Sequence, residues 1–323
     1  MRLRTPLGWA ADRWELGPRA LRWGTTAALV ASVLIVLGGV VVRVTGSGLG
    51  CPTWPTCTED SLISTPELGI HGAIEFGNRA VTVLLILAVG WAIVAARLQR
   101  PRDRMLTRLA WSMFWLVVAN AVAGGITVWV HLNPWVVALH FVLAMGLLAC
   151  ATFTWHRARW NGGAGPRPSA AARTTAWLLV LATGGLVVTG TLVTGSGPHA
   201  GDSNEVPRMG FDWTTVVVVH GATALAVLAL AVVLAFRLRT EPGGALALRR
   251  VGLFLLALLA QLALGTTQSL IGIPELLVAL HGVLAALVWV GALRVLLDTD
   301  PRLWAVRDHQ LVGGRIAEPA PSR

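Results

Sequence analysis

Long apolar stretches separated by short polar segments make up most of this chain. A transmembrane helix needs about 20 consecutive apolar residues, and eight stretches reach that length. We place them at residues 24–44, 71–96, 106–129, 135–155, 176–195, 213–236, 251–271 and 276–297. Hydrophobic residues make up 55% of the 323 residues and charged residues 13%, a balance that soluble proteins rarely reach. The pattern therefore predicts an all-α integral membrane protein with eight transmembrane helices.

The basic residues, all 26 of them arginines, predict the orientation in the membrane. They gather before the first apolar stretch, after the eighth, and between the second and third, the fourth and fifth, and the sixth and seventh. Only Arg43, Arg79 and Arg208 fall toward the opposite side. Because arginine-rich loops stay in the cytoplasm, we expect a multi-pass protein of the cell membrane with both termini cytoplasmic. The net charge of +10 reflects this topology and contact with anionic membrane lipid. Arginines scattered over separate segments argue against nucleic-acid binding.

Short motifs recur along the chain. They are Val44-Thr45-Gly46-Ser47-Gly48 with Val193-Thr194-Gly195-Ser196-Gly197, His71-Gly72-Ala73 with His220-Gly221-Ala222, and Val137-Ala138-Leu139-His140 with Val278-Ala279-Leu280-His281. The first two pairs are offset by 149 residues and the third by 141. The repeat is parallel, because an even number of helices separates equivalent positions. We therefore predict two pseudo-symmetric four-helix bundles, residues 1–160 and 161–300, joined by the Gly/Pro-rich segment Asn161–Ser169. A polar cytoplasmic tail, residues 301–323, follows with a composition typical of disorder.

Four of the eight histidines fall within the apolar stretches: His71, His140, His220 and His281. A polar side chain at membrane depth is a functional hypothesis by default. Neutral imidazole is a common ligand of heme iron, and two facing histidines from different helices can hold one iron. The alternative is a histidine that bridges helices by hydrogen bonds. Repetition of the motifs favours ligation, above all for His220 and His281.

The start of the second predicted helix carries unusual charge. At about 100° per residue, His71, Glu75, Asn78 and Arg79 share one helix face, and Glu75 and Arg79 have the spacing of an i,i+4 ion pair. A structural ion pair between helices is one interpretation. The sixth predicted helix, however, repeats the histidine without the acid or the arginine, and the matching positions are Ala224, Val227 and Leu228. This asymmetry indicates chemistry in the first half and a simpler cofactor site in the second.

Two cysteines lie in the first outer loop. Cys51 and Cys57 are six residues apart on the oxidising side of the membrane, where a disulfide is stable. Such a disulfide could be structural or redox-active, and the sequence leaves both open. Zinc is disfavoured, because only two thiolates are available and no histidine stands at a zinc-finger spacing. Cys150, near the cytoplasmic end of the fourth helix, is expected to be a small packing residue.

In these residues the chain resembles the heme A synthase family, over roughly residues 22–297. The resemblance rests on the segment Thr45-Gly46-Ser47-Gly48-Leu49-Gly50-Cys51-Pro52-Thr53-Trp54-Pro55-Thr56-Cys57, on Ile74-Glu75, and on the histidines of the fourth, sixth and eighth helices. It implies that His220 and His281 ligate a heme b cofactor and that His140 helps to bind the heme O substrate. It implies that Glu75 is an essential acid and that Cys51 and Cys57 are the family's outer cysteine pair. The implied reaction oxidises a heme methyl group to formyl by successive hydroxylations, with water as the oxygen source.

One position departs from that family. Where the family often reads Glu-x-x-His-Arg, this chain has Glu75-Phe76-Gly77-Asn78-Arg79, and asparagine is a poor iron ligand. Either His71 takes over with a shifted heme, or the substrate iron lacks that ligand. Candidate partners implied by the resemblance are heme O synthase and a quinone or other electron acceptor, and a homo-oligomer is left open. The alternative functions are a b-type cytochrome for quinol-linked electron transfer and a transporter with histidine proton relays.

Overall fold

A computed structural model describes residues 5–160, 166, 168–199, 201–202, 205–303 and 311–312. Most of the predicted linker and almost all of the predicted tail lie outside these residues. Within them, eight helices are long and apolar enough to cross a membrane, as predicted. They are α2 (Pro18–Val44), α3 (Gly69–Arg97), α4 (Arg104–Trp129), α5 (Pro134–Arg157), α6 (Ala170–Ser196), α7 (Trp213–Leu238), α8 (Ala245–Leu270) and α9 (Glu275–Thr299).

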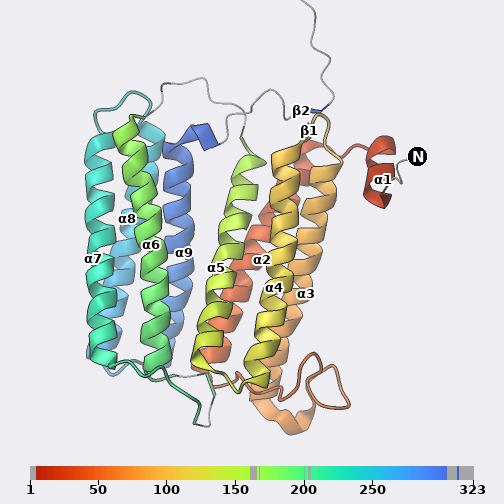
Figure 1. Ribbon diagram of the computed structural model, residues 1–323, viewed down its shortest axis with the longest axis vertical. Helices are drawn as coiled ribbons and strands as arrows, with labels where there is room; N and C mark the ends of the chain where they lie inside the picture. Colours follow the sequence, from red (N-terminus) through yellow and green to blue (C-terminus); the bar gives the residue numbers. More distant parts are fainter. Residues whose placement is uncertain are drawn as a thin grey trace, which may run out of the picture.

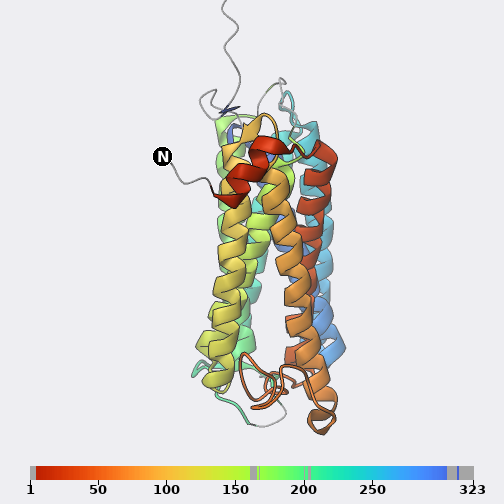
Figure 2. The same ribbon diagram turned by 90° about the vertical axis from the view of Figure 1, so that its right-hand side faces the viewer.

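Several short elements complete the fold. They are the helix α1 (Pro6–Arg13), the 3₁₀ turns η1 (Pro66–Leu68) and η2 (Pro301–Leu303), and the antiparallel strands β1 (Arg102–Asp103) and β2 (Leu311–Val312). The hydrophobic pattern did not predict α1, which lies across one end of the first bundle (Figure 2). Arg100 holds it there by donating to the carbonyl oxygens of Ala11 and Asp12 at 3.0 and 3.1 Å.

Local residues explain where the long helices begin. The side chains of Asp103, Ser169 and Asp212 each accept a hydrogen bond from the first turn of α4, α6 and α7, respectively. Such caps satisfy amide groups that have no partner inside the helix. The turns before α5 and α9 are short, as predicted, and each reverses through two consecutive residues with positive φ: His131 and Leu132 in one, Gly272 and Ile273 in the other.

The long helices form two groups, α2–α5 and α6–α9, that stand side by side (Figure 1). In the first group α2 packs mainly on α3 and α4 on α5, and the second group repeats this with α6 on α7 and α8 on α9. Between the groups α2 contacts α9, α5 contacts α6, and α5 contacts α9. Exchanging α2 with α6 and α5 with α9 maps this set of contacts onto itself. The packing is therefore consistent with the two pseudo-symmetric bundles that the sequence predicts.

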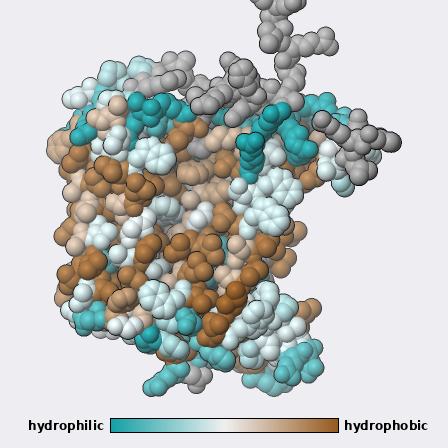
Figure 3. Space-filling view, in the orientation of Figure 1, coloured by the Kyte–Doolittle hydropathy of each residue, from teal (hydrophilic) through white to brown (hydrophobic). Residues whose placement is uncertain are grey.

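The ends of the bundles differ from their sides. Figure 3 shows hydrophobic side chains over much of the flank of the helices and hydrophilic ones gathered toward both ends, as a membrane-spanning protein requires. We call the end that carries α1 and β1 the α1 end, and the end that carries residues 45–68 the cysteine end (Figure 1).

The two large hydrophobic clusters lie toward the α1 end. The cluster of the first bundle is formed by residues from the stretches Leu21–Ala31, Leu85–Ala96, Leu106–Val117 and Leu147–Ala151. In the second bundle the stretches are Ala172–Leu186, Ala224–Leu238, Ala247–Leu258 and Val288–Leu296. A smaller cluster joins the bundles, and there the Trp289 indole donates to the carbonyl oxygen of Met145 at 3.0 Å. The predicted histidines lie beyond the large clusters, in the half of each bundle nearer the cysteine end.

Candidate functional site

The second bundle brings two histidines face to face. His220, the eighth residue of α7, and His281, the seventh residue of α9, have ring centroids 6.5 Å apart and ring planes at 61°. The Nδ1 atom of His220 hydrogen-bonds with Thr189 Oγ1 at 3.0 Å, which orients the ring and leaves its other nitrogen for a ligand. The Nδ1 atom of His281 is buried without a hydrogen-bond partner among the described residues.

Each of these imidazoles rests on a glycine of the neighbouring helix. A Cβ atom added to Gly190 of α6 would lie 3.2 Å from His220 Cε1, and one added to Gly265 of α8 would lie 2.9 Å from His281 Cε1. In the first bundle His140 rests on Gly124 of α4 in the same way, at 3.2 Å. We call these contacts glycine notches. They admit a ring between two helices, because no side chain fills the space beside it.

The pair in the second bundle suits heme iron. An imidazole nitrogen binds a metal at about 2 Å, so two imidazoles on opposite sides of one metal have ring centroids about 6 Å apart. The observed separation of 6.5 Å agrees with this value. Among the described residues no three His, Cys, Asp or Glu side chains come together to hold a metal. Two imidazoles alone suit an iron whose other ligands belong to a porphyrin.

The glycine notches also fix the register between the bundles. Gly38 of α2 and Gly190 of α6 are both the twenty-first residue of their helix, and so are Gly124 of α4 and Gly265 of α8. His140 and His281 are both the seventh residue of theirs. The offset of 141 residues between His140 and His281 therefore joins positions that match in the structure.

The offset of 149 residues, which pairs His71 with His220, does not join matching positions. The residue that packs on Gly38 is Asn78, whose Oδ1 would clash with an added Cβ atom. In α3, 19 residues follow Asn78 before the helix ends, and in α7, 18 residues follow His220. His71, in contrast, is only the third residue of α3. Asn78 is thus the structural counterpart of His220. The His-Gly-Ala identity therefore pairs residues at different depths, because α3 begins farther out than α7.

The predicted common face of α3 is divided between three surroundings. The Nδ1 atom of His71 hydrogen-bonds with Ser47 Oγ at 3.0 Å, at the junction of α3 with the outer loop. Asn78 faces α2, and Glu75 and Arg79 face the segment that contains the cysteines. His71 and Asn78 are seven residues apart, about 10 Å along the helix axis.

The cysteine segment is a closed loop fixed to α3. Cys51 and Cys57 form a disulfide, as the sequence predicted. Glu75 accepts a hydrogen bond from the Cys51 backbone N–H at 2.7 Å and forms an ion pair with Arg79 at 2.5 Å. Both of its carboxylate oxygens are therefore engaged. Arg79 also donates to the carbonyl oxygens of Thr53 and Thr56 at 3.1 and 2.8 Å. The charged pair therefore holds the loop at the mouth of the first bundle.

An aromatic side chain fixes the same loop to α4. A Cβ atom on Gly125 would lie 2.5 Å from the Trp54 ring, and Trp54 meets Trp129 edge to face with centroids 5.5 Å apart. The loop thus spans from α3 to α4. The sequence showed the cysteines and the charges, but the seat of Trp54 on Gly125 depends on tertiary contact. The glycine notches, in contrast, have a signal in the sequence that could have revealed them. Gly124 and Gly265 are separated by the same 141 residues as His140 and His281.

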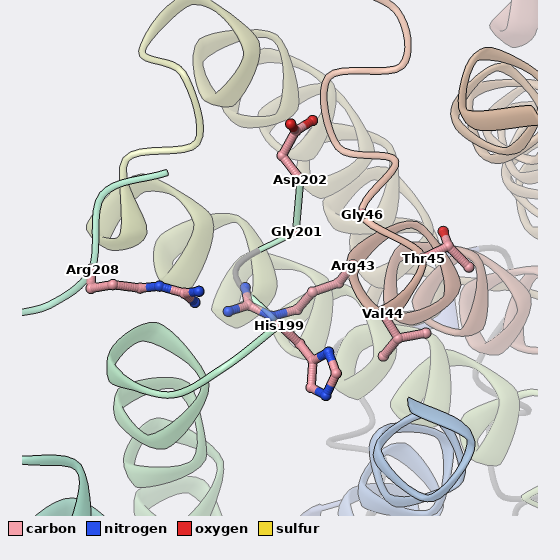
Figure 4. Close-up of a pocket in the computed structure, with 8 residues that line it drawn as sticks. All are labelled: Arg43, Val44, Thr45, Gly46, His199, Gly201, Asp202 and Arg208. Carbon is pink, nitrogen blue, oxygen red and sulfur yellow. The ribbon is translucent and has the colours of Figure 1, made fainter. Parts of the chain in front are cut away.

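The outer segments of the two bundles are joined to each other. Gly48 donates its N–H to the carbonyl oxygen of Gly201 at 2.7 Å, and Ser47 forms a β-bridge with Asp202. A cavity of about 270 Å³ lies at this junction, and Arg43 and Arg208 point toward one another across it (Figure 4).

Both guanidinium groups at this cavity bind the end of α6. Arg43 donates to Thr194 O and Arg208 to Gly197 O, each at 2.6 Å. Burial lowers the pKa of the Arg208 guanidinium below its ordinary value. The sequence singled out neither arginine as a site residue, and their contacts assign them to the junction.

Comparison with known proteins gives the family. The model of the family described as cytochrome oxidase assembly protein matches residues 21–293. The chain belongs to this family. Curated relatives carry the name heme A synthase. That of Lysinibacillus sphaericus is 27% identical over 155 residues, 47% of this chain and 50% of that protein. That of Symbiobacterium thermophilum is 34% identical over 137 residues, 42% of either chain. The matched part thus spans about half or less of each relative's length.

Proposed function

We propose that this member of the family is a heme A synthase, a membrane oxidoreductase that converts heme O to heme A. The observation that carries the proposal is the pair of facing imidazoles, His220 and His281, each seated in a glycine notch of the second bundle. Together with relatives named heme A synthase, it supports heme b as the bound cofactor. Heme b, when bound there, supplies a one-electron carrier within the membrane.

The first bundle is the proposed substrate half. His140 lies in a glycine notch at the same depth as His281 and supplies an imidazole for the substrate heme. The cysteine loop lies at the outer end of this bundle and spans from α3 to α4. Glu75 and Arg79 hold that loop. The proposed role of Glu75 is to orient substrate or water, or to stabilise a cationic intermediate on the oxidised methyl group.

The reaction replaces methyl hydrogens by oxygen from water. Each hydroxylation releases an electron pair and two protons, and loss of water from the doubly hydroxylated carbon gives the formyl group. An electron acceptor of the quinone class takes the electrons. We place this chemistry near the cysteine end, on the outer side of the membrane, with both termini cytoplasmic and residues 161–300 as the cofactor half. Heme O synthase is the proposed supplier of substrate.

Pigment analysis tests the function. We expect that a host which makes heme O but lacks its own heme A synthase will form heme A, or its hydroxymethyl precursor, when this chain is expressed. Heme b bound to the purified protein without either product would favour an electron-transferring b-type cytochrome. Purified protein with no Soret band would favour the transporter.

A glycine substitution tests the second bundle. In Gly265→Ala the new methyl group would lie 2.9 Å from His281 Cε1 and push the ring away. We expect heme b affinity to fall about 10-fold or more, the effect of disturbing a ligand's support, as measured by heme content per protein. Gly252→Ala, in the same helix, is the control, because its added Cβ meets nothing within 4 Å. Equal heme content in both variants would contradict a role of the Gly265 notch in heme binding.

A further inference from the structure

Three glycine notches hold a histidine, and the glycine at the fourth matching position, Gly38, does not. Gly124, Gly190 and Gly265 carry the rings of His140, His220 and His281, whereas Gly38 carries the amide of Asn78. The positions correspond, because Gly38 and Gly190 are each the twenty-first residue of their helix. The second bundle therefore presents two facing imidazoles, and the first presents one imidazole and one amide.

His71, the other candidate on α3, does not occupy the place of Asn78. His71 lies about 10 Å farther along the axis of α3, and its Nδ1 atom is hydrogen-bonded to Ser47 Oγ at 3.0 Å. Its backbone also packs closely on the outer loop, since a Cβ atom on Gly50 would clash with the carbonyl oxygen of His71. Tight contact with the outer loop keeps His71 at the end of the helix.

Asn78 is a weak substitute as a ligand. Its amide is neutral and shorter than an imidazole, and iron in proteins prefers imidazole to amide oxygen. The Oδ1 atom is buried without a hydrogen-bond partner among the described residues. A buried amide oxygen without a hydrogen bond costs free energy unless another group bonds to it.

We propose that the heme of the first bundle is held by His140 alone and keeps an open iron coordination position on the side of Asn78. The inference rests on the proposed function, since it takes the ligand of this bundle to be a heme. The Asn78 amide then lies beside the open position, where it can hydrogen-bond a small molecule such as water. The two bundles would hold hemes of different ligation: six-coordinate in the second, five-coordinate or weakly six-coordinate in the first.

Carbon monoxide distinguishes the two ligation states, because it binds reduced heme that has an open position. We expect CO to bind about half of the reduced heme in protein purified from cells that make heme O. In Asn78→His that fraction should fall at least about fivefold while total heme stays the same, because the imidazole closes the position. His71→Ala should leave the fraction unchanged. His140→Ala should lose the CO-binding heme and keep the low-spin heme.

Wild-type protein whose heme is low-spin throughout and unreactive toward CO would overturn the inference. So would a CO-binding heme that appears only after His71→Ala, since His71 would then be the second ligand. None of these readouts needs turnover, and the first of them needs only the wild-type protein. Heme A is measured separately in the same cells. CO binding to half of the heme without heme A would sink the proposed function and support the ligation proposed here.

Discussion

Replacing His281 by alanine is expected to remove heme b from the second bundle. The facing rings of His220 and His281 are the only pair of histidines that the described residues bring into ring contact, and their separation of 6.5 Å suits one metal between them. Removing an iron ligand weakens heme binding more than removing a residue that only supports the ligand. The affinity for heme b should therefore fall more than about 100-fold. A reduced-minus-oxidised spectrum of the purified protein measures the loss of the low-spin signal.

Two variants make this experiment specific. His281→Met should keep the heme and raise its reduction potential, since thioether and imidazole together ligate heme iron at higher potential. His199→Ala removes a histidine of the outer segment that hydrogen-bonds with Ile273 O at 2.9 Å, and it should leave the spectrum unchanged. An unchanged low-spin signal in His281→Ala would show that His281 is not a ligand.

Replacing Arg79 by alanine is expected to free the cysteine loop and abolish most heme A formation. Arg79 donates to the carbonyl oxygens of Thr53 and Thr56 and pairs with Glu75, whose side chain is only 8% exposed. Removing one partner of a buried ion pair costs about 3–5 kcal/mol. We expect the loop rather than the bundle to take up this cost, because the large hydrophobic clusters lie elsewhere.

The loop's release can be measured apart from activity. Cys51 and Cys57 are fully buried, so their alkylation after mild reduction should accelerate about 10-fold or more in Arg79→Ala, as expected of a local opening. Arg208→Ala, in the outer segment of the second bundle, is the matched control. Glu75→Gln keeps an acceptor for the Cys51 N–H and loses the charge, so it separates the two roles of Glu75. Heme A formation that falls in Glu75→Gln without faster alkylation would assign the carboxylate to chemistry.

The sequence predicted the helices well, because each apolar stretch is long, uninterrupted and bounded by arginine, proline or a capping residue. It also placed His140 and His281 within membrane-spanning helices, since the turns before α5 and α9 are short and leave little freedom of register. The His-Gly-Ala identity misled the comparison of His71 with His220, because local identity says nothing of where a helix begins. α3 has 29 residues and α7 has 26, and His71 lies in the added turn.

What could not be predicted lies between elements distant in the chain. Glu75 and Arg79 looked like a pair within one helix, and nothing in their spacing showed that the backbone of Cys51 and Thr56 would share them. The partnership of Gly38 with Asn78 likewise depends on how α2 packs on α3. The helix α1 was missed because eight residues carry too little periodicity to stand out, although Thr5 and Pro6 form a recognisable helix start.

The position of the hydrophobic clusters bears on how a large ligand can be exchanged. A synthase must admit a porphyrin and release it again in every cycle, whereas a cytochrome can fold around its pigment for good. Here the large hydrophobic clusters pack the helices together near the α1 end. The histidines and glycine notches lie beyond these clusters, toward the cysteine end. Under the proposed function, an opening of the cysteine end that admits a porphyrin would break the contacts between the outer segments of the two bundles and leave the large hydrophobic clusters in place.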